Sequence, residues 1–150
     1  MSGVFLEALR QVFAETGIRV ADVAAGGGSR SGGPVGQVLA SVGVTGELRC
    51  NLMLCADNRS ADGILRGMTA GLPLPADRHG ELPRAAMGEI ANQIAGRAAT
   101  LLASHGLRCD ITPPTVVTAD RIDSLLAGSV AAWTVRGDFG VLRLVTARER

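Results

Sequence analysis

The chain has 150 residues, of which 47% are hydrophobic and 19% are charged, and this composition predicts one globular domain with a sizeable core. The formal net charge of +1 argues against a dedicated surface for nucleic acid or for a membrane. All 15 basic residues are arginine, which excludes enzymes that depend on a Schiff-base lysine or a phosphate-loop lysine.

The three cysteines form an odd number, and the N-terminal residues do not resemble a signal peptide. Cys50 and Cys55 lie in a predicted strand and at its end, where their spacing places them on opposite faces. We therefore expect buried, reduced thiols and a cytoplasmic protein. No apolar run reaches the roughly 18 residues that a membrane span requires.

The first half begins with a predicted helix over Val4–Thr16, which has apolar residues at helical spacing and is closed by Gly17. The segment Asp22–Pro34 is rich in glycine and serine, so we predict a flexible loop there within the single domain. It lacks the endings of a phosphate loop and the glycine spacing of a dinucleotide site, which argues against nucleotide binding.

A β-hairpin is predicted next, because apolar residues alternate over Val38–Val44 and again over Leu48–Leu54. Thr45–Gly46 forms the turn between the two strands. A short helix is expected over Ala61–Ala70, with Ser60 as its N-cap.

The stretch Glu81–His105 predicts one long helix, since it contains good helix formers and no β-branched run. At 100° per residue, one broad stripe of this helix is apolar and should be buried. The stripe consists of Met87, Ile90, Ala91, Ile94, Ala98, Leu101 and Leu102. The opposite face carries Glu89 and Asn92 and then small residues, so another surface can approach its backbone. That surface could belong to the same chain or to a partner.

After the long helix, Leu107–Val117 reads as extended chain, and Asp120–Ala127 is expected to form a helical turn or a short helix. A second hairpin is predicted from Ser129–Arg136 and Phe139–Thr146 around Gly137–Asp138, a strong hairpin signal. A helix followed by a hairpin thus occurs twice. We therefore predict an α/β (α+β) domain of two such halves with a pseudo-two-fold relation, its antiparallel sheet packed against the long helix.

Glu89-x-x-Asn92 and the small residues after it resemble the signature helix of the CheC/CheX chemotaxis phosphatases. Thr112–Val117 is similar to the proline-bearing segment that follows this helix in CheX. The resemblance extends more loosely from about Val35 to the C-terminus. The single Glu-x-x-Asn copy is closer to CheX, because many CheC proteins carry two. The first helix has Glu7-x-x-Arg10 instead.

The resemblance implies a phosphatase that hydrolyses the phospho-aspartate of a CheY-like receiver domain in chemotaxis or two-component signalling. In that role Asn92 orients the attacking water, and Glu89 pairs with the lysine of the receiver. The small residues Gly96, Ala99 and Thr100 let the helix lie against the receiver. The resemblance also implies a homodimer. The alternative is a non-catalytic module of the same type that binds receiver domains or other signalling proteins, and a third reading is a fold relative with an unrelated ligand.

We expect no cofactor or metal of the chain's own, and Mg²⁺ is expected in the receiver partner. The two histidines, His79 and His105, have no second ligand at metal-binding spacing. One position departs from the family pattern, which has Asp or Ser four residues before the glutamate, where this chain has Ala85. The substitution puts activity or partner preference in doubt, but not the fold.

Overall fold

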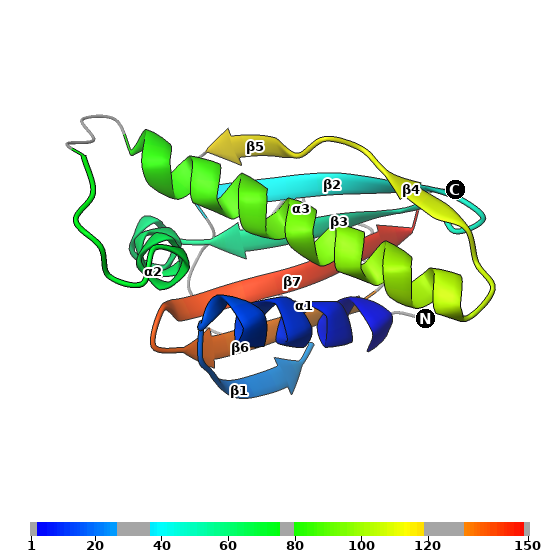
Figure 1. The fold of residues 1–150 in the computed structure, drawn as a ribbon, viewed down its shortest axis with the longest axis horizontal. Coiled ribbons are helices and arrows are strands. Elements are labelled where there is room, and N and C mark those ends of the chain that lie inside the picture. The colour runs from blue at the N-terminus through cyan, green and yellow to red at the C-terminus, as the bar shows by residue number, and fades with distance from the viewer. Residues whose placement is uncertain (1–2, 27–36, 76–79, 119–130, 149–150) are drawn as a thin grey trace.

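Three helices lie on one face of a seven-stranded sheet (Figure 1) in the computed structural model of the chain, which describes residues 3–26, 37–75, 80–118 and 131–148. The helices are α1 (Gly3–Thr16), α2 (Asn58–Met68) and α3 (Glu81–Ser104). The strands are β1 (Val20–Ala25), β2 (Val38–Gly46), β3 (Cys50–Ala56), β4 (Cys109–Ile111), β5 (Thr115–Thr118), β6 (Ala131–Gly137) and β7 (Gly140–Arg148).

The sheet is antiparallel with the order β1-β6-β7-β3-β2-β4, and β5 also pairs with β2. The order is symmetric about the central pair of β3 and β7. The strand that follows α1 adds to the hairpin of the second half, and the strands that follow α3 add to the hairpin of the first half. The predicted pseudo-two-fold arrangement of helix and hairpin is therefore confirmed, with the edge strands exchanged between the halves.

Both predicted hairpins are confirmed. In the first, β2 and β3 pair from Val38 opposite Ala56 to Val44 opposite Cys50. In the second, Gly137 pairs with Gly140, so the turn is formed by residues 138 and 139, one residue later than predicted. Gly140 has φ of +122°, a conformation that favours glycine, and this explains the position of the turn.

The core lies between the helices and the sheet. The alternating residues of β2 and β3 that were predicted to face it are all buried there, and Cys50 is among them. The largest side chains with less than 2% exposure are Phe13, Leu9, Leu52, Leu54, Ile64, Met87, Ile90, Ile94, Leu102, Leu142 and Leu144. Phe13 meets Phe139 edge to face, with ring centroids 5.7 Å apart.

The opposite face of the sheet carries a second, smaller apolar cluster of Leu39, Met53, Cys55 and Val145. Cys50 and Cys55 therefore do lie on opposite faces, and both are buried free thiols, while Cys109 is a half-buried one. Arg143 lies on β7 opposite Cys55 and is buried, and its Nε has no hydrogen-bond partner among the described residues.

The predicted loop over Asp22–Pro34 is wrong at its beginning, because Asp22–Ala25 belongs to β1. The strand pairs with β6, Gly26 N–H continues the pattern by donating to Ala132 O at 2.8 Å, and Asp22 lies 3.8 Å from Arg136. Backbone pairing to a distant strand stabilises this segment, whose own residues have little strand preference. Residues 27–34 of the predicted loop, and the helical turn predicted at 120–127, lie outside the described residues.

The N-cap of α2 is Asp57 rather than Ser60. The carboxylate of Asp57 accepts a hydrogen bond from Ser60 N–H at 2.7 Å, so α2 begins earlier than predicted. Ser60 is buried instead, and its hydroxyl oxygen accepts a hydrogen bond from Val141 N–H at 3.0 Å. This contact ties α2 to the start of β7.

A side-chain clamp joins α1 to α3. Arg97 on α3 donates to Glu15 on α1 through both terminal nitrogens, at 2.9 and 2.6 Å, and to Gln11 Oε1 at 3.0 Å. The bidentate hydrogen bond and the positive charge of Arg97 hold the pKa of Glu15 below its ordinary value. The clamp supplements the apolar contact between the two helices.

Two helix glycines should respond to alanine in opposite ways. A Cβ at Gly63 in α2 would collide with the carbonyl oxygen of Phe139, so we expect Gly63→Ala to lower the free energy of unfolding. A Cβ at Gly96 in α3 would lie 3.9 Å from Ile111, an ordinary contact. Gly96→Ala should therefore raise the free energy of unfolding by about 1 kcal/mol, because alanine has the higher helix propensity. Chemical denaturation measures both variants, and a change of the same sign in both would contradict the tight approach of α2.

The interaction between Arg97 and Glu15 predicts that the protein loses a small part of its stability at acidic pH. Since the pKa of Glu15 is lowered in the folded state, its contribution is present above the ordinary pKa and is lost as the pH falls through the lowered one. Glu15→Gln should therefore flatten the acid side of a plot of melting temperature against pH. The effect is small because the pair is exposed. Glu7→Gln, on the same helix, is the control. Identical acid-side curves for wild type and Glu15→Gln would refute the coupling.

Candidate functional site

The orientation of α3 is determined by its buried stripe. Met87, Ile90 and Ile94 are fully buried, as predicted, and Leu101 is half-buried against the same core. Because successive residues are rotated by about 100°, this places Glu89 on the solvent side, exposed, and Asn92 beside it, half-buried. The predicted face assignment of the helix is confirmed.

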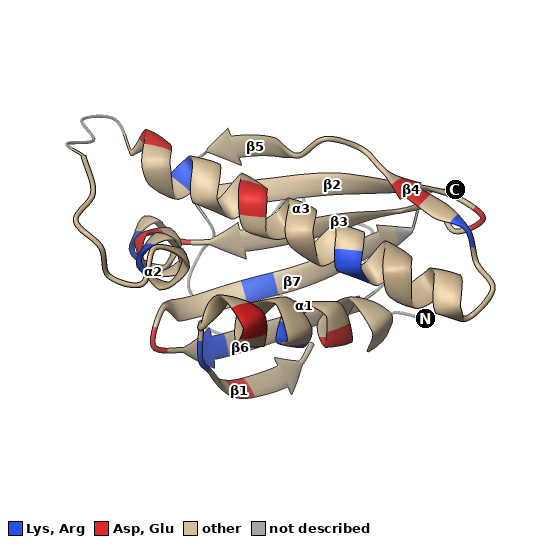
Figure 2. Ribbon diagram, viewed as in Figure 1, with Lys and Arg blue, Asp and Glu red and all other residues tan. Residues whose placement is uncertain are grey.

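Glu89 and Asn92 project one turn apart from the middle of a long, regular helix. The helix begins after Gly80, which has the left-handed conformation with φ of +66°, and the acidic Glu81 in the first turn is favourable at the positive end of the helix dipole. Figure 2 shows that the charged residues of α3 are widely spaced, with uncharged helix surface between them. A rigid helix fixes the distance between the two functional groups better than a loop would.

Gln93 holds the carboxylate of Glu89 in place. Its Nε2 donates a hydrogen bond to Glu89 Oε1 at 3.1 Å, between two exposed side chains one turn apart. Sequence reasoning did not single out Gln93, although the spacing of the pair is visible in the sequence. The second carboxylate oxygen of Glu89 has no hydrogen-bond donor among the described residues.

The amide of Asn92 has no hydrogen-bond partner among the described residues, so both its oxygen and its nitrogen are available to an incoming group. An amide neither gains nor loses a proton near neutral pH and cannot serve as a base. It can accept one hydrogen bond while donating another, which is what holds a water molecule in a defined direction.

The small residues that were predicted to contact a partner lie in two different environments. Gly96 and Ala99 are half-buried, and Gly96 lies beside Ile111 of β4. Thr100 is exposed, and its hydroxyl donates to Gly96 O at 3.1 Å. Packing within the chain therefore accounts for part of this face. The exposed part runs through Glu89, Gln93 and Thr100.

The proline-bearing segment between β4 and β5 lies alongside α3. Thr112 anchors it to β2, because Thr112 N–H donates to Gly43 O at 2.9 Å and its hydroxyl oxygen accepts from Gly43 N–H at 2.8 Å. Pro114 and Val116 then pass close to Gly88 of α3, where a Cβ would lie 3.1 Å from Val116 Cγ2. Glycine at position 88 is what allows the segment to approach the helix.

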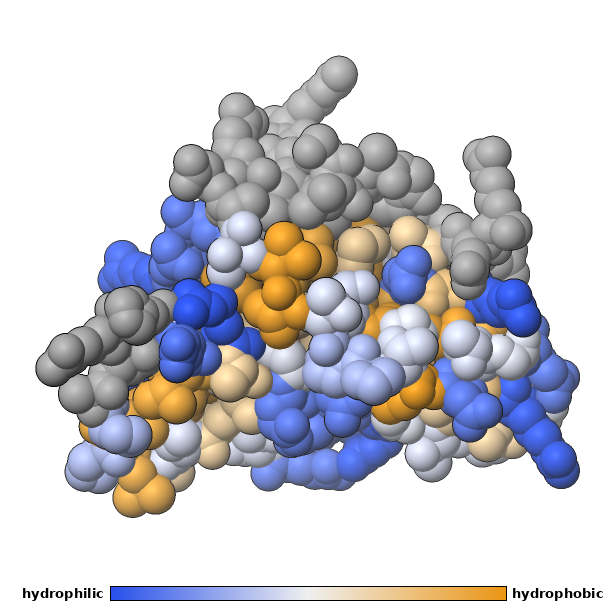
Figure 3. Space-filling view, turned by 90° about the horizontal axis from the view of Figure 1, so that it is seen from above, coloured by the Kyte–Doolittle hydropathy of each residue, from blue (hydrophilic) through white to orange (hydrophobic). Residues whose placement is uncertain are grey.

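The exposed face of α3 is thus bordered by α1 on one side and by the β4–β5 segment on the other (Figure 1). From the β5 side, apolar side chains form several separate patches rather than one continuous surface (Figure 3). The exposed large apolar residues among those described are Leu72, Leu74 and Val117. An apolar docking face of the obligate-dimer kind is therefore not formed by the described residues of this side.

The described residues contain no group of three His, Cys, Asp or Glu side chains that could hold a metal ion, and no described helix is long and apolar enough to cross a bilayer. At the middle of α3, the carboxylate of Glu89 and the free amide of Asn92 are the groups open to an incoming partner. Such a pair can position a water molecule and a cation.

Comparison with known proteins gives several relatives that are CheX proteins. The curated CheY-P phosphatase CheX of Thermotoga maritima is 34% identical over 77 residues, which cover 51% of this chain and 48% of that protein, so the match spans about half of the relative. The crystal structure of CheX from Desulfovibrio desulfuricans superposes with a TM-score of 0.74 at 18% identity, covering 99% of this chain and 98% of the other.

A second solved structure contains a partner. It is the complex of CheX with CheY, BeF3 and Mg²⁺ from Borrelia burgdorferi, which matches with a TM-score of 0.76 at 21% identity over 98% of this chain and 97% of that one. These structures confirm the predicted fold. The family model of the chemotaxis phosphatase CheX matches residues 38–136, a range that includes the first hairpin, α2, α3, the proline-bearing segment and all but the last residue of β6. The chain belongs to the chemotaxis phosphatase CheX family.

Proposed function

We propose that this protein hydrolyses the phospho-aspartate of a CheY-like receiver domain, with the exposed face of α3 as the docking surface. The observation that carries the proposal is that Glu89 and Asn92 project together into solvent from α3 in a member of this family. The complex of a relative with CheY and Mg²⁺ supports a receiver domain as the partner.

Asn92 is proposed to place the attacking water. Phosphoryl transfer depends mainly on positioning and on charge compensation, and a free amide fixed on a helix supplies positioning without a proton transfer of its own. The half-buried position of Asn92 limits its side-chain freedom before the partner arrives. The receiver would contribute the phosphoryl group, the Mg²⁺ and a lysine.

Glu89 is proposed to pair with that lysine. Its carboxylate is exposed and already oriented by Gln93, which reduces the side-chain entropy lost on docking. The lysine–carboxylate pair would set the angle at which the receiver meets α3. Thr100 and the exposed parts of Gly96 and Ala99 would form the flat part of the same docking surface.

Replacement of Asn92 and of Glu89 should have different consequences. Asn92→Ala should leave receiver binding nearly intact and lower the dephosphorylation rate about 10²-fold or more, because the lost interaction forms in the transition state. Glu89→Ala should weaken binding by about 2–5 kcal/mol, roughly 30-fold or more, since it leaves the lysine unpaired. Loss of phosphate from a purified phospho-receiver, measured with Mg²⁺ alongside a binding titration, separates the two effects.

Asn51→Ala on β3 is the matched control for Asn92→Ala. Asn51 is exposed and lies between Cys50 and Leu52, whose side chains face the helices, so it is on the opposite face of the sheet. This variant should leave rate and binding unchanged. Equal and small effects of Asn92→Ala and Glu89→Ala would place catalysis elsewhere. Binding of the phospho-receiver by the wild-type protein without any increase in its dephosphorylation would show a non-catalytic binding module.

Ala85 offers a second test of the docking surface. It is exposed one turn before Glu89, where the family pattern has Asp or Ser. We expect Ala85→Ser to strengthen binding of the phospho-receiver severalfold by adding a hydrogen-bonding group, while turnover at saturating receiver changes little. An increase in turnover with unchanged affinity would instead give position 85 a part in the chemical step. Ala103→Ser, at the far end of the same exposed face, is the control.

Homodimer formation stays a prediction. Among the described strands, β1 forms an edge of the sheet with one side that no other strand pairs with, and it carries mostly small residues, which favours pairing with a second chain.

A further inference from the structure

A hollow with an excess of arginine lies away from the exposed face of α3, where α1 passes into β1 and where α2 meets the turn between β6 and β7. Its volume is about 590 Å³, and Arg19, Arg59 and Arg66 line it together with Asp62 and Asp138. This volume falls within the range of small-molecule sites, which is about 300–1,000 Å³.

Two glycines allow α2 to pack closely at the border of the hollow. Gly63 lies against the carbonyl of Phe139, and a Cβ at Gly67 would be 2.7 Å from Ile18 Cγ1. Contacts within the chain therefore require glycine at both positions, and the charged side chains that α2 contributes to the hollow are those of Arg59, Asp62 and Arg66. Ile18 and Phe139, both almost fully buried, contribute apolar surface at its base.

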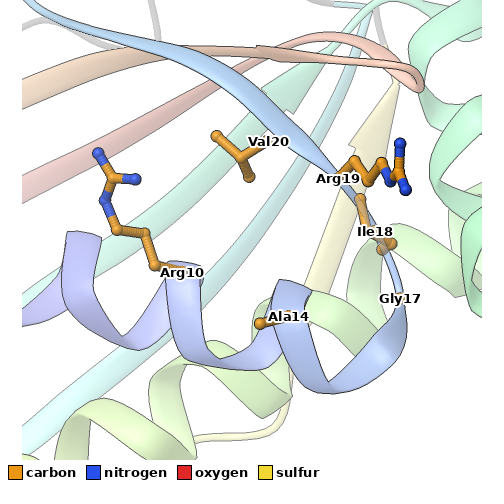
Figure 4. A pocket seen from close by; sticks show the side chains of 6 residues that line it. All are labelled: Arg10, Ala14, Gly17, Ile18, Arg19 and Val20. Carbon is orange, nitrogen blue, oxygen red and sulfur yellow. The ribbon is translucent and has the colours of Figure 1, made fainter.

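A neighbouring hollow of about 510 Å³ shares Gly17, Ile18 and Arg19 with the first. Figure 4 shows Arg10 of α1 and Arg19 at opposite ends of it, with Ala14 and Val20 between them. The connection between α1 and β1 thus separates two concave regions, and Arg19 borders both.

The arginines are incompletely neutralised. Arg66 is paired with Asp62 at 3.0 Å, but Arg10, Arg19 and Arg59 form no ion pair with any described residue. Three guanidinium groups and two carboxylates line the first hollow, and Arg10 adds another positive charge from the second. Because a guanidinium offers a planar fork of donors, unpaired arginines around a concavity suit a phosphate better than a neutral ligand.

We propose that the first hollow binds a small phosphate-bearing molecule with at least two negative charges, held by Arg19 and Arg59. Arg66 reinforces the charge, and the apolar base contacts the uncharged part of the ligand. Asp138 limits the affinity, so the ligand exchanges with solvent and is not a resident cofactor. The site is separate from Glu89 and Asn92 and does not depend on the activity proposed for them.

The test uses inorganic pyrophosphate as the probe and follows the backbone amides of Gly17, Gly63 and Gly67 by NMR. Wild type should show saturable shifts at these amides. Arg19→Gln and Arg59→Gln should each weaken binding about tenfold, because each removes one charge-assisted contact to the phosphate. Both residues are exposed, so the variants should fold, and a melting curve checks this.

Arg49→Gln is the matched control. Arg49 lies in the turn between β2 and β3, whereas the hollow lies near α2, which follows the opposite end of β3. The variant therefore removes the same charge at a distance from the hollow. It should leave pyrophosphate binding unchanged, as should Asn92→Ala. Absence of saturable shifts in wild type at pyrophosphate concentrations up to about 10 mM, which would detect a dissociation constant of about 1 mM, would overturn the proposal. Equal weakening by Arg49→Gln would also overturn it, because it would show only general charge attraction. Tighter binding of an acidic peptide than of pyrophosphate would assign the surface to a protein partner instead.

Discussion

The buried stripe of α3 is the interaction on which the rest of the structure depends. Met87, Ile90 and Ile94 pack into the core between the helices and the sheet, and Ala91 and Ala98 let the helix approach closely. Burial of such side chains contributes about 1.5–3 kcal/mol each, which far exceeds any exposed contact on the same helix. The rotation of α3 about its axis is therefore set by the core. The direction of the functional groups follows from it.

Two small residues on α3 pack against other parts of the same chain, whether or not a partner binds. Gly88 admits the proline-bearing segment, and Gly96 borders Ile111, so both sides of the exposed face are shaped by contacts within the chain. On the other flank, Arg97 holds α1 through Glu15. The part of the helix left for docking is consequently narrow, and it is held rigidly between two neighbours. A partner that meets this face encounters an already ordered surface.

Much of the fold could be predicted because its patterns are local. The alternation along β2 and β3, the turn between β6 and β7, and the helical stripe of α3 all report directly on which face is buried. β1 was missed because its sequence, mostly alanine and valine beside a glycine-rich stretch, has no alternation, and β6 stabilises it from far along the chain. The choice of Asp57 over Ser60 as N-cap depended on a contact with Val141 that only the folded chain reveals.

The candidate site, like the fold, could be predicted only where its interactions are local in sequence. Glu89, Asn92 and the orientation of their helix could be inferred from spacing, and the hydrogen bond from Gln93 follows a local rule that was not applied. The bridge from Arg97 to α1 joins residues distant in sequence, and no pattern predicts it. The roles of Glu89 and Asn92 rest on the family, since the helix geometry alone is compatible with binding as well as with catalysis.

The symmetry of the two halves shows how one helix can acquire this chemistry while its counterpart does not. α1 and α3 precede equivalent hairpins, and α1 has Glu7 and Arg10 at the same spacing as Glu89 and Asn92. A guanidinium only donates hydrogen bonds and stays charged, so Arg10 cannot both accept from and donate to a water as an amide can. In α1 the acidic side chain at position 15 is instead used to hold Arg97. The first half therefore supports the second, and of these two equivalent helices α3 is the one that presents a free amide beside a free carboxylate oxygen, because the amide of Gln11 on α1 is bonded to Glu7 and Arg97.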